Sequence, residues 1–234
     1  NVTGCETDIR DIGNELAKYN NILFMVDASQ SAGTIPIDVQ KMNIDLLAFT
    51  GHKSLYGLSG IGGLYIREGI DLLPLKTGGT GIKSELLMQP KSMPIYYESG
   101  THNILGLAAL SSGIKFIKKI GIEKIRHHKK LCVEKMMSHL TQLKNVILYP
   151  GYSGDNMPDL FSFNIKNMDP ADVGYMLQKS FNIVTRSGLH CAPLIHNFLG
   201  SVPHGSVRTS PSWFTTERDI DKFNRAITAI SRAS

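Results

Sequence analysis

Lysine can react with a carbonyl group, and one lysine of this chain directly follows a strand-like apolar run. Residues 46–50 read Leu-Leu-Ala-Phe-Thr, and Gly51, His52 and Lys53 come next. Open α/β sheets hold their ligands at the carboxyl ends of their strands. A lysine that is partly desolvated there has its neutral amine favoured, as Schiff-base chemistry requires. The sequence therefore predicts a carbonyl-binding role for Lys53, against the alternative of a solvated surface lysine.

A carboxylate and several hydrogen-bonding side chains are expected near that lysine. Asp27 follows the apolar run at 22–26, and Gln30 comes shortly after it. Because parallel strands bring their carboxyl ends to one edge of a sheet, Asp27 and Lys53 are expected to face each other across a crevice. A carboxylate can keep a pyridine nitrogen protonated, while a glutamine and the Thr50 hydroxyl can bind a ring oxygen or a phosphate. This set suits pyridoxal phosphate (PLP), whereas Asp27 alone would be interpreted as a turn residue.

A second group of chemically active residues surrounds Cys191. The thiol is expected in a loop between a strand and Pro193, with Arg186 and His190 as positive or polarising neighbours. Such surroundings favour the thiolate, which is the reactive form of cysteine. Farther along the chain, Arg208 can bind a carboxylate through paired hydrogen bonds, against the alternative of a surface salt bridge. These residues predict a nucleophilic thiol and a carboxylate-binding arginine.

Helices and strands alternate along the first half of the chain, which predicts an α/β fold. The apolar run at 22–26 is typical of a strand buried on both faces, and hence of a parallel sheet. Residues 74–100 are rich in Gly, Pro and Ser and are expected to form a long ordered loop that carries function. The predicted helices cover 8–19, 103–119, 122–143, 170–179 and a last segment from 216. The predicted strands cover 22–26, 45–49, 62–66, 145–149, 159–165, 181–185 and 205–209.

Two domains are expected. Residues 1–119 are predicted to be the C-terminal part of a large parallel-sheet domain, and residues 120–234 to be a smaller α+β domain. The chain opens on Asn1 and a turn instead of a methionine. We therefore expect a fragment of a longer protein.

The composition is that of an ordinary globular enzyme. The 234 residues carry a formal charge of +5, and the basic residues are scattered apart from a cluster at 126–130. That cluster is expected to be a solvated helix face, so no nucleic-acid partner is predicted. No apolar stretch reaches a membrane-spanning length. Three cysteines at unrelated spacings predict free thiols in a reducing cytoplasm, with Cys5 and Cys132 as small buried apolar residues.

Three short motifs resemble the fold-type I, class V aminotransferase family of PLP enzymes, and most closely its cysteine desulfurases. They read V-D-A-S-Q at 26–30, T-G-H-K at 50–53 and E-S-G-T at 98–101. The resemblance implies that PLP is the cofactor and that Lys53 binds it covalently. It assigns the other contacts to Asp27 at the pyridine nitrogen, Gln30 at the phenolic oxygen, and Thr50 and His52 at the phosphate.

The same resemblance implies a homodimer. A threonine that matches Thr101 reaches the phosphate bound by the other subunit in such enzymes. His102 stands where the family usually has proline, so the local turn departs from the family pattern while the Thr101 hydroxyl is kept.

The run R-x-G-x-x-C at 186–191 resembles the desulfurases with a short active-site loop. The resemblance implies that Cys191 attacks the sulfur of a substrate cysteine and becomes a persulfide, with Lys53 and His52 as the other catalytic residues. Substrate contacts would come from Asn1, Arg186 and Arg208. The sulfur would then pass to an acceptor protein, for iron–sulfur clusters or other sulfur-containing products.

Other activities stay open from the sequence. The substrate can be cysteine or a related amino acid, so a selenocysteine lyase or another class V PLP lyase or aminotransferase is the alternative. In the family, a phosphate-binding turn and a histidine that stacks on the pyridine ring lie upstream of the residue that matches Asn1. We therefore expect the 234-residue chain alone to be weakly active or inactive, and a noncatalytic interaction protein is a further alternative.

Overall fold

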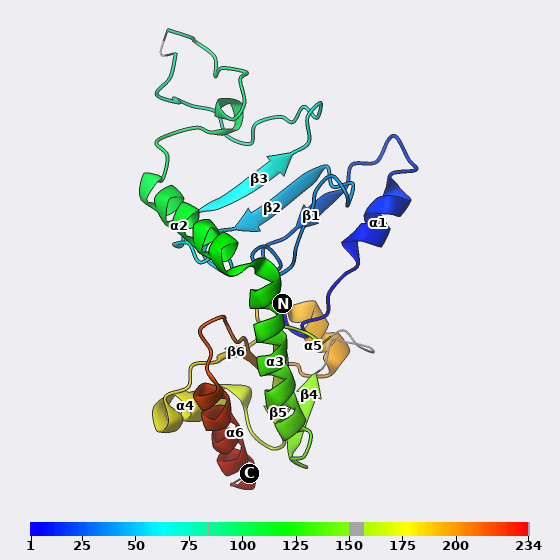
Figure 1. The fold of residues 1–234 in the computed structure, drawn as a ribbon, viewed down its shortest axis with the longest axis vertical. Coiled ribbons are helices and arrows are strands. Elements are labelled where there is room, and N and C mark those ends of the chain that lie inside the picture. The colour runs from blue at the N-terminus through cyan, green and yellow to red at the C-terminus, as the bar shows by residue number, and fades with distance from the viewer. Residues whose placement is uncertain (84, 150–156, 234) are drawn as a thin grey trace. The chain divides into compact units, whose positions relative to one another are not determined.

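Short strands and helices alternate along the computed structural model, which describes residues 1–83, 85–149 and 157–233. The chain divides into two units (Figure 1). The N-terminal unit comprises Ile9–Lys119, and the C-terminal unit comprises Asn1–Asp8 together with Ile120–Ser234. The first eight residues thus group with the second half of the chain, and the boundary expected at 119 stays a prediction of domain organisation.

The N-terminal unit is built on a three-stranded sheet in the order β1-β2-β3. The predicted parallel pairing is confirmed between the first two strands, whereas β3 runs antiparallel to β2 and makes the sheet mixed. Val26, Met42 and Ile44 are among the buried residues of its core. The strands are β1 (Met25–Asp27), β2 (Leu46–Thr50) and β3 (Gly62–Ile66), and the helices are α1 (Ile9–Leu16), α2 (Ile104–Ile120) and the short 3-10 helix η1 (Ile95–Tyr97).

The predicted burial of the strand at 22–26 on both faces is wrong. Ile22, Leu23 and Met25 are 42%, 54% and 56% exposed, respectively. The strand begins only at Met25, and it lies at an edge of the described sheet with β2 as its single partner. Described residues therefore cover only part of its apolar surface.

The C-terminal unit contains an antiparallel sheet in the order β4-β5-β7-β6. Helices pack on this sheet through an apolar core centred on Phe161, Phe163 and Phe223, whose rings contact one another edge-on or tilted. The strands are β4 (Val146–Tyr149), β5 (Phe161–Ile165), β6 (Arg186–Gly188) and β7 (Ser206–Thr209). The helices are α3 (Ile122–Leu140), α4 (Pro170–Phe181), α5 (Pro193–Leu199) and α6 (Glu217–Arg232).

The predicted strand at 181–185 is wrong. The observed strand, β6, begins at Arg186, one residue after the end of the predicted strand. Helix α4 extends to Phe181 and ends on Asn182, whose left-handed backbone (φ +50°) forms its C-cap. Asparagine tolerates this conformation better than most residues with a side chain. The apolar residues that follow connect α4 to β6, which pairs with β7 from Arg186 onward.

An N-terminal segment, Asn1–Asp8, is anchored within the C-terminal unit. Val2 is buried, and the Ser162 hydroxyl donates to its carbonyl oxygen at 2.6 Å. Gly4 has φ +76°, and a Cβ atom there would lie 2.3 Å from the carbonyl oxygen of Leu160. Only glycine fits such a close backbone approach in this conformation. These contacts fix the position from which Asn1 reaches the strands of the unit.

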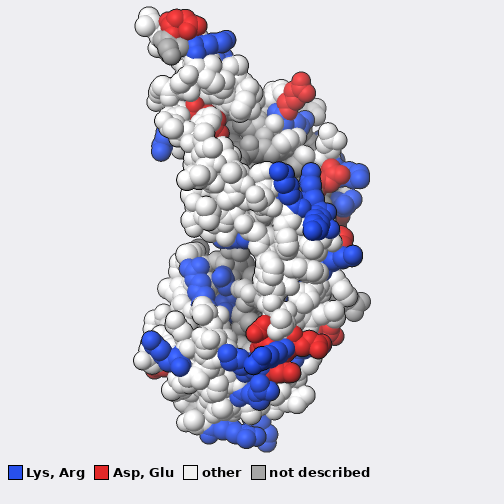
Figure 2. Space-filling model, turned by 60° about the vertical axis from the view of Figure 1, so that its left-hand side comes forward, with Lys and Arg blue, Asp and Glu red and all other residues white. Residues whose placement is uncertain are grey.

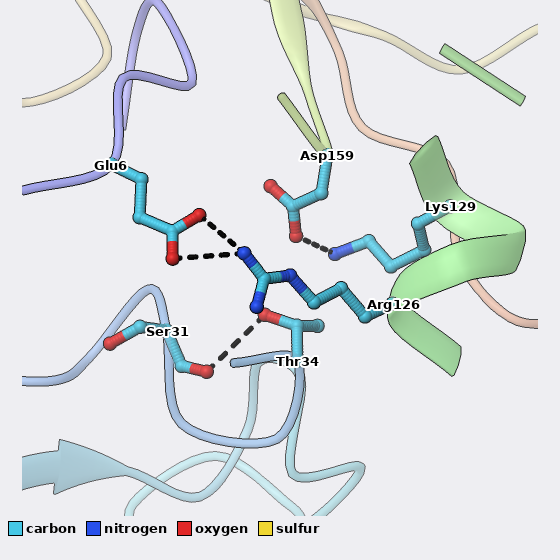
Figure 3. A network of polar contacts seen from close by, with 6 residues as sticks. All are labelled: Glu6, Ser31, Thr34, Arg126, Lys129 and Asp159. Carbon is cyan, nitrogen blue, oxygen red and sulfur yellow. Dashed lines mark hydrogen bonds and ion pairs between the residues drawn. The ribbon is translucent and has the colours of Figure 1, made fainter. Parts of the chain in front are cut away.

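The basic cluster at 126–130 is not the solvated helix face that its charge predicts. Arg126 Nη2 donates to both carboxylate oxygens of Glu6, at 3.0 and 2.8 Å. Lys129 is buried and donates to Asp159 at 2.5 Å (Figure 3). These carboxylates come from distant parts of the sequence, so local charge pattern could not reveal the pairing. On the face shown in Figure 2, the basic side chains form several separate groups with acidic side chains among them.

We expect the Lys129–Asp159 pair to contribute more to stability than an exposed pair on the same helix. Asp159→Asn leaves the buried ammonium without its counter-charge and should lower the unfolding free energy by about 2 kcal/mol. Glu217→Gln, which disrupts the exposed pair with Lys135, is the matched control and should change it far less. Urea unfolding of both variants measures the difference, and equal losses would contradict the assignment.

Among the described residues, no helix is both long enough and apolar enough to cross a membrane.

Candidate functional site

The predicted site residues fall into two clusters, one in each unit. The lysine cluster of the N-terminal unit contains Asp27, Gln30, Thr50, His52 and Lys53. The thiol cluster of the C-terminal unit contains Asn1, Arg186, His190, Cys191 and Arg208. Thr101 lies outside both clusters, exposed in the segment before α2.

The lysine cluster forms at one edge of the mixed sheet. Strands β1 and β2 are parallel, with Asp27 in register with Ala48, so both end at the same edge. Hydrogen bonds from the Ser29 side chain and backbone lower the pKa of Asp27, and the positive charge of Lys53 adds to this effect. Asp27 is therefore an ionised carboxylate within electrostatic range of Lys53, as the strand ends predict.

Side-chain exposure in the lysine cluster differs from the sequence-based expectation. Lys53 and His52 are exposed, so the predicted desolvation of the lysine is wrong for this structure. Gln30 is exposed as well. The Thr50 hydroxyl is buried and has no hydrogen-bond partner among the described residues. The strand register explains the cluster's position, but described residues do not enclose the lysine.

The thiol cluster is organised by the pairing of β6 with β7. Their register sets Arg186 directly opposite Arg208. Like charges in opposing positions destabilise a sheet, so an anion bound by both guanidinium groups would relieve their repulsion. Burial, followed by the charge of Arg186, lowers the pKa of Arg208. The Arg208 Nε atom is buried without a hydrogen-bond partner among the described residues, which leaves a donor available to an anion.

Asn1 connects Arg208 to the cysteine loop. Arg208 Nη1 donates to the backbone oxygen of Asn1 at 2.8 Å and to its side-chain oxygen at 2.5 Å. The Asn1 side-chain amide in turn donates to the carbonyl oxygen of His190 at 2.5 Å. One side chain thus links strand β7 to the residue that precedes Cys191.

Cys191 is an exposed free thiol beside a guanidinium group. Arg186 Nη2 lies 3.0 Å from Cys191 Sγ, and a cation at this position stabilises a thiolate. The other two cysteines are also free. Cys132 is buried as predicted, and burial raises the pKa of its thiol. Cys5 is exposed, which contradicts its predicted burial, because it lies on the surface segment that follows Gly4.

The sequence leaves His190 as a positive or polarising neighbour of the thiol, and the structure excludes the positive role. It is 2% exposed, and burial together with the charge of Arg208 lowers its pKa to about 4. Its Nε2 atom is hydrogen-bonded to the hydroxyl of Ser206, and its ring lies 5.6 Å from that of His196. Ser206 and His196 were missed because neither shows a recognisable motif. The pairing of β6 with β7, which sets Gly188 opposite Ser206, is the signal that could have found the serine.

Comparison with known proteins agrees with this arrangement. The model of the aminotransferase class-V family matches residues 1–223 of the chain. The chain belongs to this family. The match covers both clusters, so the predicted motifs and the two units lie within one family architecture.

Several proteins similar to this chain carry the name cysteine desulfurase or probable cysteine desulfurase. A probable cysteine desulfurase of Methanothermobacter thermautotrophicus is 33% identical over 99% of this chain and 58% of its own length. Another from Pyrococcus abyssi is 36% identical over 95% of this chain and 55% of its own length. The apo structure of a cysteine desulfurase from Thermococcus onnurineus NA1 has a TM-score of 0.91, with 32% identity, and matches 100% of this chain and 58% of that one. The chain therefore spans somewhat more than half the length of these relatives.

The lysine cluster fits the cofactor that the class V family implies. PLP needs an amine for covalent attachment, an anion at its pyridine nitrogen and donors for its phosphate. Lys53 carries a primary amine, and Asp27 is ionised because its pKa is lowered. The buried, unpartnered hydroxyl of Thr50 can supply a phosphate donor. These three groups meet the chemical requirements of the cofactor.

The low pKa of His190 predicts that acid destabilises the C-terminal unit. Its folded pKa of about 4 lies below the ordinary value of 6.5, so the unfolded chain binds the proton more readily. The contribution of neutral His190 to the free energy of unfolding is present above about pH 6.5 and is lost as the pH falls toward 4. The free energy of unfolding should change by on the order of 2 kcal/mol over this range. The charges of Arg208, His196 and Arg186 also disfavour protonation of the ring.

We expect His190→Asn to flatten this pH dependence in urea unfolding between pH 7 and about pH 4. The same change at the exposed His127 serves as the control and should leave the slope unaltered. Burial also lowers the pKa of His196, so part of the slope should remain in the His190 variant. An unchanged slope in His190→Asn would contradict the buried, neutral state of this histidine.

Proposed function

We propose that this protein is a PLP-dependent cysteine desulfurase, which converts cysteine to alanine and receives the sulfur as a persulfide on Cys191. The observation that carries the proposal is the thiol cluster. Arg186 stands opposite Arg208 across two strands, and the Cys191 sulfur lies 3.0 Å from Arg186. A carboxylate-binding arginine and a cation-paired thiol are what sulfur removal from an amino acid requires. The names of the relatives support this activity.

The lysine cluster would hold the cofactor. In this proposal Lys53 attaches PLP covalently, Asp27 keeps the pyridine nitrogen protonated, and Gln30 binds the phenolic oxygen. Thr50 and His52 bind the phosphate. Bound PLP supplies an electron sink that weakens bonds at the substrate carbon atoms. His52 also completes the catalytic set with Lys53 and Cys191.

The thiol cluster would bind the substrate and accept its sulfur. Arg208 binds the substrate carboxylate, while Asn1 orients the guanidinium group through its hydrogen bonds. Arg186 stabilises the Cys191 thiolate. The thiolate forms an S–S bond with the substrate sulfur as the carbon–sulfur bond breaks, and the carbon takes up a proton to give alanine. A sulfur-acceptor protein then removes the outer sulfur, for iron–sulfur or other sulfur-containing products.

A homodimer and a reducing, cytoplasmic location complete the proposal. Three free thiols suit a reducing compartment. The loop before Thr101 exposes large apolar side chains, which favours contact with a second copy of the chain. The most exposed are Leu73, Leu75, Leu87 and Met88. Sedimentation equilibrium should give a dimer, and a monomer at micromolar concentration would contradict this part of the proposal.

Product analysis tests the proposed activity against its alternatives. We expect the protein as its gene encodes it, supplied with PLP and a thiol reductant, to release alanine and sulfide from cysteine in equal amounts. A keto acid in place of alanine would indicate an aminotransferase and overturn the proposal. Faster turnover of selenocysteine with little turnover of cysteine would assign the protein as a selenocysteine lyase.

A further inference from the structure

Two successive residues at the reactive thiol adopt the left-handed backbone conformation. His190 has φ +52° and Cys191 has φ +60°. Residues with a side chain rarely adopt this conformation, and neighbouring contacts must hold them in it. We propose that His190 is a positioning residue, whose buried imidazole holds the loop so that the Cys191 sulfur stays beside Arg186.

The imidazole of His190 is anchored on the strand that carries Arg208. Its Nε2 atom lies 3.1 Å from the Ser206 hydroxyl, and that serine is fully buried. Ser206 begins β7, and Arg208 lies two residues along the same strand. The hydrogen bond therefore ties the thiol loop to the element that also positions Arg208.

Helix α5 supports the same ring from another side. His196 is fully buried, and its ring is tilted by 43° against that of His190 at 5.6 Å between centroids. Its Nδ1 atom is hydrogen-bonded to the Ser201 hydroxyl at 2.7 Å. The two imidazole rings thus pack against each other with each ring fixed by a serine.

The backbone of His190 is held as well as its side chain. The Asn1 side-chain amide donates to the His190 carbonyl oxygen, which belongs to the peptide group that leads into Cys191. A residue whose side chain and carbonyl group are both bonded has little freedom to leave a strained conformation. This fixed peptide group sets the orientation of Cys191.

His190 acts through position and not through charge. Burial and the charge of Arg208 keep its imidazole neutral at physiological pH, because its pKa is about 4. The guanidinium group of Arg186 is then the cation at the sulfur. Removing the imidazole should let the sulfur move away from Arg186, which lowers the fraction of reactive thiolate.

The inference rests on the proposed function only for the statement that Cys191 is the nucleophile. Its test uses alkylation of the thiol, which needs neither cofactor nor substrate. A protein that failed to desulfurate cysteine would overturn the proposed function and leave this result intact. The two ideas can therefore fail separately.

The experiment measures iodoacetamide modification of the three cysteines by mass spectrometry across a range of pH. Exposed Cys5 is the internal reference for reagent and pH, and buried Cys132 reports unfolding. Ser206→Ala removes the anchoring oxygen atom. His190→Asn removes the imidazole but keeps a residue that tolerates the left-handed conformation. His127→Asn, at an exposed histidine, is the matched control.

We expect the ratio of Cys191 to Cys5 modification near neutral pH to fall about fivefold in Ser206→Ala and in His190→Asn, the scale of one lost buried hydrogen bond. The pH profile of Cys191 modification should move to higher pH in both variants, and the double variant should lose no more than either single one. His127→Asn should match the parent. An unchanged or higher ratio in Ser206→Ala, with Cys132 still protected, would overturn the proposal. Reactive Cys132 in both variants would make His190 a residue of the folded core, which also overturns it.

Discussion

Replacing Cys191 by serine is expected to abolish sulfur removal from cysteine while PLP still attaches to Lys53. A hydroxyl at this position fits the loop but is not ionised beside Arg186, so it cannot attack sulfur as the thiolate does. Loss of a nucleophile lowers turnover by on the order of 10³-fold or more. Alanine and sulfide release, followed over time in the protein as its gene encodes it, measures the effect.

Cys5→Ser is the control for this experiment, because Cys5 is also an exposed free thiol. It should retain the parent rate. Sulfide release at the parent rate from the Cys191 variant would contradict the proposal that Cys191 becomes a persulfide. The thiol beside Arg186 and Arg208 would then have no part in sulfur removal.

Lys53→Arg is expected to have an effect of similar size, but through the cofactor. Arginine keeps the positive charge at the end of β2, yet its guanidinium group stays protonated and cannot form an imine. Turnover of cysteine should fall by on the order of 10³-fold or more. Borohydride reduction in the presence of PLP should mark Lys53 in the parent and no residue in its place in the variant.

The exposed Lys76 offers the matched substitution. Lys76→Arg should keep both the borohydride-fixed pyridoxyl group on Lys53 and the parent rate. If the Lys53 variant kept full activity, or if borohydride fixed the cofactor to another lysine, the lysine cluster would not be the cofactor site.

The lysine cluster was predictable because its geometry follows from local sequence. Apolar runs that end in Asp27 and in Thr50 form parallel strands, and parallel strands end at one edge. The direction of β3 was not predictable in this way. Its antiparallel pairing with β2 depends on the path of residues 51–61, in which Gly51 donates its backbone N–H to Ile61.

The thiol cluster was only partly predictable. The residue types around Cys191 indicate a reactive thiol, but cross-strand register decides which of them meet. The strand predicted at 181–185 would not have contained Arg186, whereas the observed β6 begins there and faces Arg208. Sequence could not decide between a positive and a polarising His190, because its burial depends on Ser206 and His196, which only the folded loop brings to it.

Ion pairs between residues far apart in the sequence were also not predictable. Lys129 belongs to a basic run that is expected to be solvated, yet Asp159 neutralises it within the C-terminal unit. The spacing of residues in a helix shows which side chains share a face, but it does not show which distant carboxylate will pair with them. Sequence therefore predicted which residue types gather in the two clusters better than the contacts that hold them there.

Mass spectrometry of Cys191 after exposure to cysteine tests the central claim most directly. The PLP-loaded protein, in the form its gene encodes, is mixed with cysteine without reductant, quenched with an alkylating agent and digested. We expect the Cys191 peptide to carry one additional sulfur atom, and we expect none in Lys53→Arg. An unmodified Cys191 in protein that has produced alanine would contradict the account, because the sulfur would then have left by a route that does not use this thiol.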